Sequence, residues 1–255
     1  MYIISITNEK GGVAKTTTTL SLGGALVEAG YEVLLVDLDA QANLTLGLGL
    51  TPAKMHRTVT DVLMNSATIV SASRETDIPG LDIVPANAGM GTAERFLPVR
   101  QNYELILKNA LCATDSPARY DFVLLDCPPS LGAVTINALT AANVVITPTQ
   151  PEYFSVYGLR NVMATIRKVR SQGNPDLLYY ILITMMDRRN RIHRTLREQL
   201  EQTFSNGLLK TVIEVDTKLR ESTVVGKPIT HHNTHSRSAG QYRALAQELI
   251  QNVKA

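Results

Sequence analysis

The chain has 255 residues, 44% of them hydrophobic and 19% charged, and its formal net charge is only +2. Its two cysteines, Cys112 and Cys127, lie far apart in the sequence, which excludes a disulfide framework and indicates a reducing compartment. No apolar run approaches the roughly 20 residues that span a bilayer, and an apolar segment from Tyr2 leaves no room for a signal peptide. We therefore expect a cytoplasmic protein without a membrane-spanning segment.

Charge is divided unevenly along the chain. Residues 1–159 carry 9 Lys and Arg against 15 Asp and Glu, whereas residues 160–255 carry 16 against 8. An excess of positive charge in one part of a chain indicates a surface that binds a polyanion. Chance clustering of basic residues on solvated helices is the alternative that charge alone leaves open.

Short apolar runs that alternate with segments of helical spacing predict the fold. The expected strands are Tyr2–Ser5, Val33–Asp37, Leu81–Val84, Phe122–Asp126, Val144–Thr147, Tyr180–Ile183 and Thr211–Ile213. The expected helices are Thr16–Ala29, Gly91–Ala110, Val134–Ala142, Tyr157–Ser171, Arg191–Phe204 and Ala239–Val253, with a short one near Thr60. This order predicts one α/β domain over residues 1–255, a single doubly wound, mostly parallel sheet with helices on both faces.

A glycine pair and a lysine separate the first expected strand from the first expected helix, in the segment Asn8–Thr17. Backbone N–H groups in such a loop converge on an anion, and the helix N-terminus adds positive charge. Lys15 is placed to reach the outer phosphates of a nucleotide, and Thr16 to place its hydroxyl on Mg²⁺. A glycine-rich turn without a ligand is the alternative. The expected nucleotide contacts are Lys10, Gly11, Gly12, Val13, Ala14, Lys15, Thr16 and Thr17.

Carboxylates follow two further expected strands. Asp37 and Asp39 come at the end of the second, and Asp126 ends a buried run from Phe122. Ligands of such sheets bind at the carboxyl ends of the strands, so these groups should meet the glycine loop in one crevice. A carboxylate fixed by a rigid strand suits a Mg²⁺ site beside a phosphate. An acidic turn without a catalytic role is the alternative. The expected metal ligands are Thr16, Asp37, Asp39 and Asp126.

The pattern of residues 10–17, KGGVAKTT, resembles the deviant Walker A box of the ParA/MinD family of partitioning and positioning ATPases, and within it the ParA/Soj-type partition proteins. It departs from the standard P-loop, because Glu9 and Ala14 stand where that loop has glycine. Residues 37–43, DLDAQAN, resemble the family's switch I, DxDPQGN, with Ala40 and Ala42 in place of proline and glycine. Further similarity covers nearly the whole chain, at residues 126–131 (switch II), 150–159, 184–187, 226–229 and 236–246.

The resemblance implies a role for each of these positions. Lys10 would cross a dimer interface to the nucleotide of the other subunit, and Asp39 would position or polarise the attacking water. With Lys15, these two are the expected catalytic residues. Met185 and Asp216 would lie near the adenine, although Glu214-Val215-Asp216 replaces the common Pro-Arg-Asn. The implied cofactors are ATP or ADP with Mg²⁺.

Basic residues cluster around the expected helix 191–204. Ile192, Leu196 and Leu200 share one face of this helix, and arginines occupy the opposite side. ParA relatives bind DNA nonspecifically through basic residues of this region, and phosphate binding needs only clustered cations. A solvated basic helix is the alternative. The expected DNA-binding residues are Arg188, Arg189, Arg191, Arg194, Arg197, Lys218 and Arg220.

These features together predict a Mg-dependent partition or positioning ATPase. It would form a nucleotide sandwich dimer, bind DNA nonspecifically on the nucleoid, and be released when a ParB-like protein or cargo adaptor stimulates slow hydrolysis. The alternatives are a MinD-like membrane-positioning ATPase, disfavoured because the chain stops at Ala255 within its last expected helix, and a nucleotide switch that does not hydrolyse ATP. A nitrogenase-type iron protein is rejected because the cysteines do not fit, and we expect no metal site at His231, His232 and His235.

Overall fold

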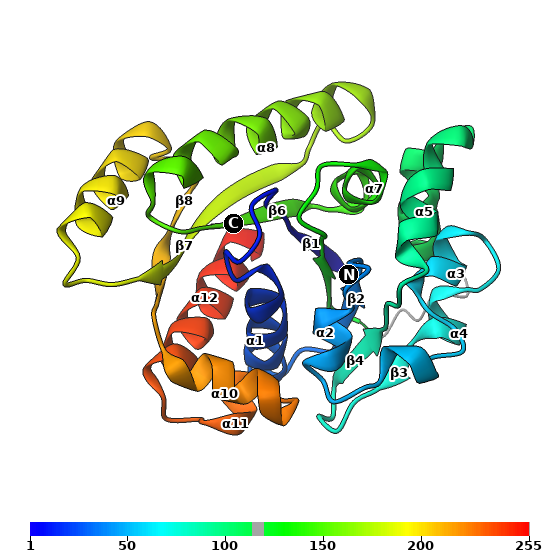
Figure 1. Ribbon diagram of the computed structural model, residues 1–255, viewed down its shortest axis with the longest axis horizontal. Coiled ribbons are helices and arrows are strands. Elements are labelled where there is room, and N and C mark those ends of the chain that lie inside the picture. The colour runs from blue at the N-terminus through cyan, green and yellow to red at the C-terminus, as the bar shows by residue number, and fades with distance from the viewer. Residues whose placement is uncertain (114–119, 255) are drawn as a thin grey trace.

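The computed structural model describes residues 1–113 and 120–254. Within these residues, eight strands form one sheet in the order β3-β4-β2-β5-β1-β6-β7-β8 (Figure 1). Neighbouring strands are parallel except β3 and β4, which are antiparallel. The expectation of a doubly wound, mostly parallel sheet is therefore confirmed. The strands are β1 Tyr2–Ile6, β2 Val33–Asp37, β3 Arg74–Glu75, β4 Leu81–Val84, β5 Phe122–Asp126, β6 Val144–Thr149, β7 Leu178–Met186 and β8 Leu208–Glu214.

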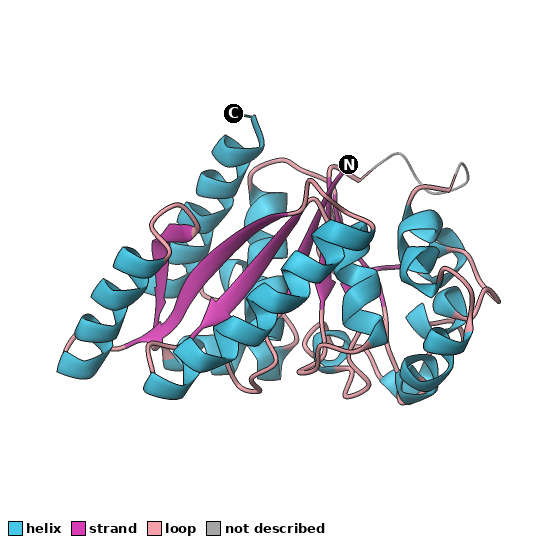
Figure 2. Cartoon of the chain, turned by 90° about the horizontal axis from the view of Figure 1, so that it is seen from above, coloured by secondary structure: helices cyan, strands magenta, loops and turns pink. Residues whose placement is uncertain are grey.

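Helices cover both faces of this sheet, with α1 and α12 on one face and α7 and α8 on the other (Figures 1 and 2). The α-helices are α1 Lys15–Glu28, α2 Asn43–Leu46, α3 Val59–Leu63, α4 Ile69–Ala72, α5 Met90–Phe96, α6 Ile106–Leu111, α7 Ala133–Ala141, α8 Tyr153–Gln172, α9 Arg191–Thr203, α10 Thr217–Val225, α11 Ile229–His232 and α12 Arg237–Lys254. The 3₁₀ helices found in the described residues are η1 Pro52–Lys54, η2 Leu97–Val99 and η3 Tyr103–Leu105. None of the helices in residues 1–113 and 120–254 combines the length and the hydrophobicity of a membrane span.

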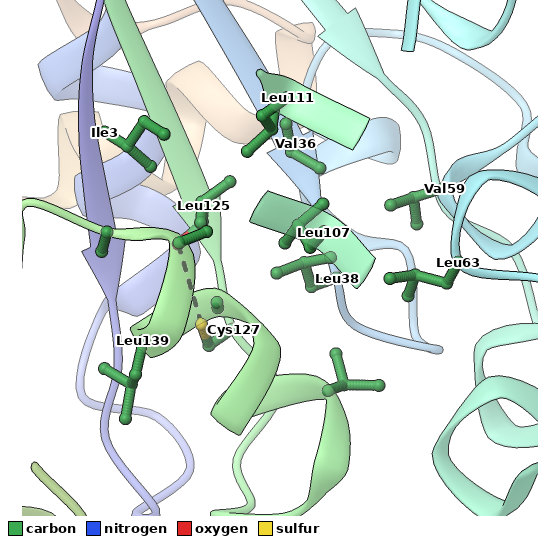
Figure 3. Close-up of a cluster of buried hydrophobic side chains, with 14 of the residues drawn as sticks. Ile3, Val36, Leu38, Val59, Leu63, Leu107, Leu111, Leu125, Cys127 and Leu139 are labelled. Atoms are coloured by element: carbon green, nitrogen blue, oxygen red, sulfur yellow. Dashed lines mark hydrogen bonds between the residues drawn. The ribbon is translucent and has the colours of Figure 1, made fainter. Parts of the chain in front are cut away.

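The core lies on the two faces of the sheet. Side chains alternate along β1, so Ile3 packs into the cluster under α7 and α8 and Ile4 into the cluster under α1 and α12. Each fully buried aliphatic side chain of this kind contributes about 1.5–3 kcal/mol. Figure 3 shows Cys127 among leucines of the first cluster. Burial raises the pKa of the Cys127 thiol to about 11, so it packs as an apolar side chain.

The expectation of one long helix over residues 91–110 is wrong. The segment instead contains α5, η2, η3 and α6. Pro98 lies within η2 and cannot donate a backbone hydrogen bond, and Asn102 adopts a left-handed conformation with φ of 54°. Both features interrupt a continuous helix. The sequence also did not predict the short elements α2, α4, α10, α11 and β3.

The register of the central strands brings the expected site together. Asp126 of β5 lies opposite Asp37 of β2 and opposite Ile6 of β1. The carboxyl ends of these three parallel strands therefore share one edge of the sheet, where the loop after β1 leads into α1. Two acidic side chains and the glycine loop meet there because of strand register, although they are far apart in sequence.

Candidate nucleotide-binding site

The loop between β1 and α1 is fixed by side chains from neighbouring strands. The Asn8 amide donates to the carbonyl of Pro148 on β6 (2.8 Å), and its Oδ1 accepts the backbone N–H of Lys10 (3.0 Å). The Thr184 hydroxyl on β7 donates to the carbonyl of Val13 (3.0 Å). The loop is therefore held at both ends before any ligand arrives, which reduces the ordering cost of binding an anion.

Two alanines in the site adopt a left-handed backbone conformation. Ala14, just before α1, has φ of 67°, and Ala42, just before α2, has φ of 52°. These are the two positions where the resembling motifs carry glycine. Glycine reaches this conformation without strain, whereas alanine pays about 1–2 kcal/mol. Both loops therefore carry backbone strain at these alanines.

Lys15 begins α1, and its side chain is only 8% exposed. Its Nζ donates to the carbonyl of Lys10 across the turn (3.0 Å). Burial lowers the pKa of Lys15, and the charges of Asp126 and Asp39 act in the opposite direction. The ammonium group is therefore held inside the glycine turn, where an anionic ligand would offset the cost of its desolvation.

The Lys10 side chain contacts residues at and just before the start of α8. Its Nζ lies 2.6 Å from Glu152 Oε2 and 3.1 Å from Ser155 Oγ, at the start of α8, and 3.5 Å from Gln150 Oε1. Both charged side chains are partly exposed, so this pair is worth at most about 1 kcal/mol. In the single chain, Lys10 thus contacts residues of its own chain. Breaking these contacts costs little free energy.

Asp37 is fully buried, and both of its oxygens are engaged. Oδ2 accepts the backbone N–H and the hydroxyl of Thr45 (2.9 and 2.7 Å), and Oδ1 accepts the backbone N–H of Asp39 (3.1 Å). Thr45 also accepts the backbone N–H of Ala86, after β4 (3.0 Å). Asp37 therefore shapes switch I and leaves Asp39 to face the cavity. The sequence analysis missed Thr45. The available signal was a hydroxyl side chain two residues after Asn43, the end of the switch I segment.

Asp126 has one buried oxygen that no described residue reaches at hydrogen-bond distance. Its Oδ1 accepts the hydroxyl of Thr19 (3.2 Å), whereas Oδ2 is buried without such a bond in the described part of the chain, and the nearby Thr16 hydroxyl lowers the pKa of Asp126. Burial raises the pKa of Asp126, and the neighbouring Asp37 adds to this effect; burial also raises the pKa of Asp37. A buried carboxylate with a free lone pair beside a second carboxylate is a place that a divalent cation would stabilise. Together with the hydroxyl of Thr16, these residues therefore fit Mg²⁺.

A cavity of about 740 Å³ opens in front of these groups. Gly11, Gly12, Ala14, Lys15, Thr16, Thr17 and Asp39 line one part of it, and Met185, Val215, Asp216, Leu219 and Val224 line another. The phosphate-binding loop and the expected adenine-side residues therefore share one space, of a size typical of small-molecule sites. Val13, expected as a nucleotide contact, has a fully buried side chain, so only its backbone is available to a ligand.

The expected adenine-side residues are themselves held by local contacts. Met185 has a left-handed backbone with φ of 53°, and the Gln150 amide lies between its sulfur and the carbonyl of Gly12 (3.1 Å to the carbonyl). Asp216 caps α10 by accepting the backbone N–H of Lys218 (3.0 Å), and it also accepts the hydroxyl of Ser238 (2.8 Å). The Asp216 carboxylate is therefore largely occupied by structural bonds.

The basic residues lie on and before α9 and on α10, and several are paired with acidic groups. Arg188 contacts Glu214 (2.7 Å), Arg189 contacts Asp187 (3.2 Å) and Arg197 contacts Glu201 (2.8 Å). Arg191, Arg194, Lys218 and Arg220 are exposed. The expected apolar face of α9 is only partly correct. Leu196 and Leu200 are buried, but Ile192 is 66% exposed because it lies in the first turn, before the helix meets the core.

The histidine segment begins in a short helix. His231 and His232 belong to α11. His231 hydrogen-bonds the hydroxyl of Thr230 (3.0 Å). Among the residues that the structure describes, no group of three or more His, Cys, Asp or Glu side chains is arranged to hold a metal ion.

Comparison with known proteins places the chain in a family. The family described as AAA domain matches residues 1–179. The chain is 41% identical to the sporulation initiation inhibitor protein Soj of Bacillus subtilis over 98% of both chains, and 38% identical to the chromosome partitioning protein ParA of Caulobacter vibrioides over 98% of this chain and 94% of that protein.

Solved structures agree with this placement. A Mycobacterium smegmatis structure named cobyrinic acid a,c-diamide synthase, with bound ADP and magnesium, has a TM-score of 0.87 at 36% identity and covers 100% of this chain and 96% of its own. The septum site-determining protein MinD of Pyrococcus horikoshii, complexed with Mg-ADP, has a TM-score of 0.79 at 28% identity, with coverage of 100% and 98%. The fold and the site define a P-loop nucleotide-binding protein. The chain belongs to the ParA/MinD family, among the Soj and ParA partition ATPases.

Proposed function

We propose that this chain binds and hydrolyses Mg-ATP, and that ATP controls the assembly of two copies on DNA. The observation that carries the proposal is that Lys15, Thr16 and Asp39 line one cavity, while the buried carboxylate of Asp126, whose charge acts on Lys15, keeps an oxygen (Oδ2) without a hydrogen bond from the described residues. Structural relatives whose titles include ADP with magnesium support the choice of cofactor. The single domain over residues 1–255 that the sequence predicts stays part of this proposal.

The residues of the site divide the chemistry among them. The backbone of residues 11–17 and the Lys15 ammonium bind and orient the phosphates, and Thr16, Asp37 and Asp126 would hold the cation. When bound, Mg²⁺ supplies positive charge that neutralises the phosphate oxygens. Asp39 lies at the cavity wall with Oδ1 accepting the backbone N–H of Gln41 (2.9 Å), so its other oxygen can orient water. Catalysis is then mainly positioning and electrostatic stabilisation.

Lys10 would act between subunits. Lys15 already occupies the glycine turn of its own chain, and Lys10 contacts Glu152 instead of lining the cavity. Because the Lys10 ammonium group does not line the cavity of its own chain, it is available to contact the nucleotide bound to a second copy. ATP would then hold two subunits together and bring their basic α9 and α10 surfaces side by side on DNA in the nucleoid. Hydrolysis, stimulated by a ParB-like protein or cargo adaptor, would release them.

Measured phosphate release from Mg-ATP tests the proposal. The wild-type chain should release phosphate slowly, and Asp39→Ala should reduce the rate by about 10² or more because a positioned group is lost. Asp77→Ala, in an exposed loop, is the matched control and should leave the rate unchanged. One structural relative carries the name of a synthase, so the reaction itself must be measured. ATP binding without any phosphate release by the wild type would instead indicate a nucleotide switch that does not hydrolyse ATP.

A further inference from the structure

Glu94, on α5, makes a contact that the proposed chemistry does not use. Its Oε1 accepts the backbone N–H of Ala133 (2.8 Å), and its Oε2 accepts that of Val134 (3.1 Å). These are the first two residues of α7, whose N-terminal N–H groups have no partner within the helix. No side chain of α7's own N-cap, Gly132, supplies this bond. A carboxylate from a different element therefore caps α7.

Gly132 is suited to this contact. A Cβ atom built at Gly132 would overlap Oε1 of Glu94, although the backbone conformation there (φ −84°) is open to any residue. Glycine is thus needed at this position for the close approach of the carboxylate and not for its backbone angles. A negative charge at a helix N-terminus is also favoured by the helix dipole. Glu94 and Gly132 together form one helix cap that fixes the first turn of α7.

The first turn of α7 is joined directly to switch II, residues 126–131. The Thr135 hydroxyl donates to the carbonyl of Ser130 (2.7 Å), which ties the helix back to the loop. The same loop begins at Asp126 and includes Pro129, which lines the nucleotide cavity. Hydrogen bonds of Glu94 and of Thr135 therefore connect α5, the first turn of α7 and the loop that follows Asp126, the candidate cation ligand at the end of β5.

We infer that Glu94 is a positioning residue for switch II. By capping α7, its carboxylate holds the loop from Asp126 to Leu131 in the geometry that hydrolysis requires. This inference rests on the proposed ATPase function, and it assigns to α5, an element outside the phosphate-binding motifs, a part in setting the rate of turnover. Because Glu94 touches neither the cavity nor the reacting groups, its effect should appear in kcat and not in nucleotide affinity.

The test combines steady-state kinetics with amide hydrogen exchange on the full chain. Glu94→Ala should lower kcat for Mg-ATP roughly tenfold or more while KM stays within about twofold, since small misplacements of catalytic groups are costly. In the nucleotide-free protein, exchange of the amides of Ala133 and Val134 should accelerate by about tenfold or more as the first turn opens. Glu94→Gln keeps one acceptor oxygen and should give intermediate values of both quantities.

Two further variants separate positioning from general destabilisation. Gly132→Ala should displace the carboxylate and reproduce the kinetic loss of Glu94→Ala, and the double variant should lose no more than either single one, because the two residues act as a unit. The control is Glu248→Ala. Glu248 likewise accepts two consecutive backbone N–H groups, those of Lys210 (2.7 Å) and Thr211 (3.0 Å), but at β8. Its loss should leave kcat unchanged.

The outcomes are distinct. Faster exchange in Glu94→Ala with kcat equal to wild type would overturn the inference, since the cap would then be structural only. Exchange equal to wild type would overturn it too, because Glu94 would not hold the turn. Additive losses in the double variant would show that the two residues act independently and would contradict the single helix cap. Absence of ATP hydrolysis by the wild type would contradict the proposed function itself. This outcome is distinguishable from failure of the Glu94 inference, because it is seen without any substitution.

Discussion

Ala14 is the residue at which the strain of the phosphate-binding loop can be measured. Its left-handed φ of 67° disfavours a side chain, and the residue is only partly buried. Ala14→Gly should therefore raise the free energy of unfolding of the nucleotide-free protein by about 1 kcal/mol. Ala42→Gly should raise the free energy of unfolding by less, because Ala42 is 2% exposed and the change removes a buried methyl group.

Chemical denaturation of the nucleotide-free chain measures this difference. Ala164→Gly is the matched control, since Ala164 is exposed in the middle of the right-handed helix α8. That substitution should lower the free energy of unfolding by about 1 kcal/mol. A loss of stability in Ala14→Gly similar to that in Ala164→Gly would contradict the account of strain at the loop.

The buried pair of Asp37 and Asp126 predicts a pH dependence of stability. Burial raises both pKa values above those of the unfolded chain, so the folded state binds more protons than the unfolded state above about pH 4. This contribution to stability is present at low pH and is lost as the pH rises through the folded pKa values. The unfolding temperature of the nucleotide-free wild type should therefore fall between about pH 5.5 and about pH 7.5. The fall should be larger than that of Asp126→Asn over the same interval.

Thermal unfolding of both variants across this interval provides the measurement. Asp126→Asn removes one of the two facing carboxyls, which leaves Asp37 without its like-charged neighbour and should flatten the pH profile. Asp77→Asn, at an exposed loop position, should keep the wild-type profile. A profile of Asp126→Asn as steep as that of the wild type would show that the pair does not control it.

At the scale of elements, the α9 surface makes the DNA proposal testable. The alanine variant of Arg191, Arg194 and Arg197 should weaken binding of the ATP-bound protein to DNA of any sequence and reduce its salt dependence, because fewer phosphate contacts release fewer counterions. Arg197 is paired with Glu201, so Glu201→Gln should free it and tighten binding modestly. ATP-dependent assembly should remain.

Binding to duplexes of unrelated sequence over a range of salt concentrations is the measurement. Arg167→Ala with Lys168→Ala removes two exposed positive charges from α8, against three in the α9 variant, and so controls for a loss of charge away from α9. If the triple variant binds like the wild type, the surface lies elsewhere, with Lys218, Arg220 and Arg237 the next candidates. If the wild type with ATP binds no DNA at all, a membrane or protein matrix replaces DNA in the proposal.

Strong local signals explain which elements the sequence could predict. The apolar strands and α1 carry such signals, and residues 10–17 and Asp126 follow directly from strand ends. The long helix expected over 91–110 failed because apolar spacing continues through Pro98 and Asn102, where the backbone turns. The Glu94 contact with α7 could not be predicted, since it depends on how two helices distant in sequence meet.

As a whole molecule, the protein would act as a pair of chains under the proposed function. The Lys10 side chain is held by Glu152 and Ser155 of its own chain, through contacts weak enough to be exchanged for the nucleotide of another copy. Lys10→Ala should therefore preserve ATP binding by the single chain while abolishing ATP-dependent assembly. Calorimetric titration with ATP would check the first part, and Lys54→Ala, at an exposed position of η1, provides the matched control.

Light scattering of the Asp39→Ala variant with Mg-ATP tests this central claim most directly, because slowed hydrolysis should trap the assembled state. With ATP, the mass should be about twice the 27.9 kDa of one chain. Without ATP, or when the Asp39→Ala variant also carries Lys10→Ala, it should be that of a single chain. A single-chain mass of Asp39→Ala with ATP, or a dimer that persists when Lys10 is replaced, would contradict this claim.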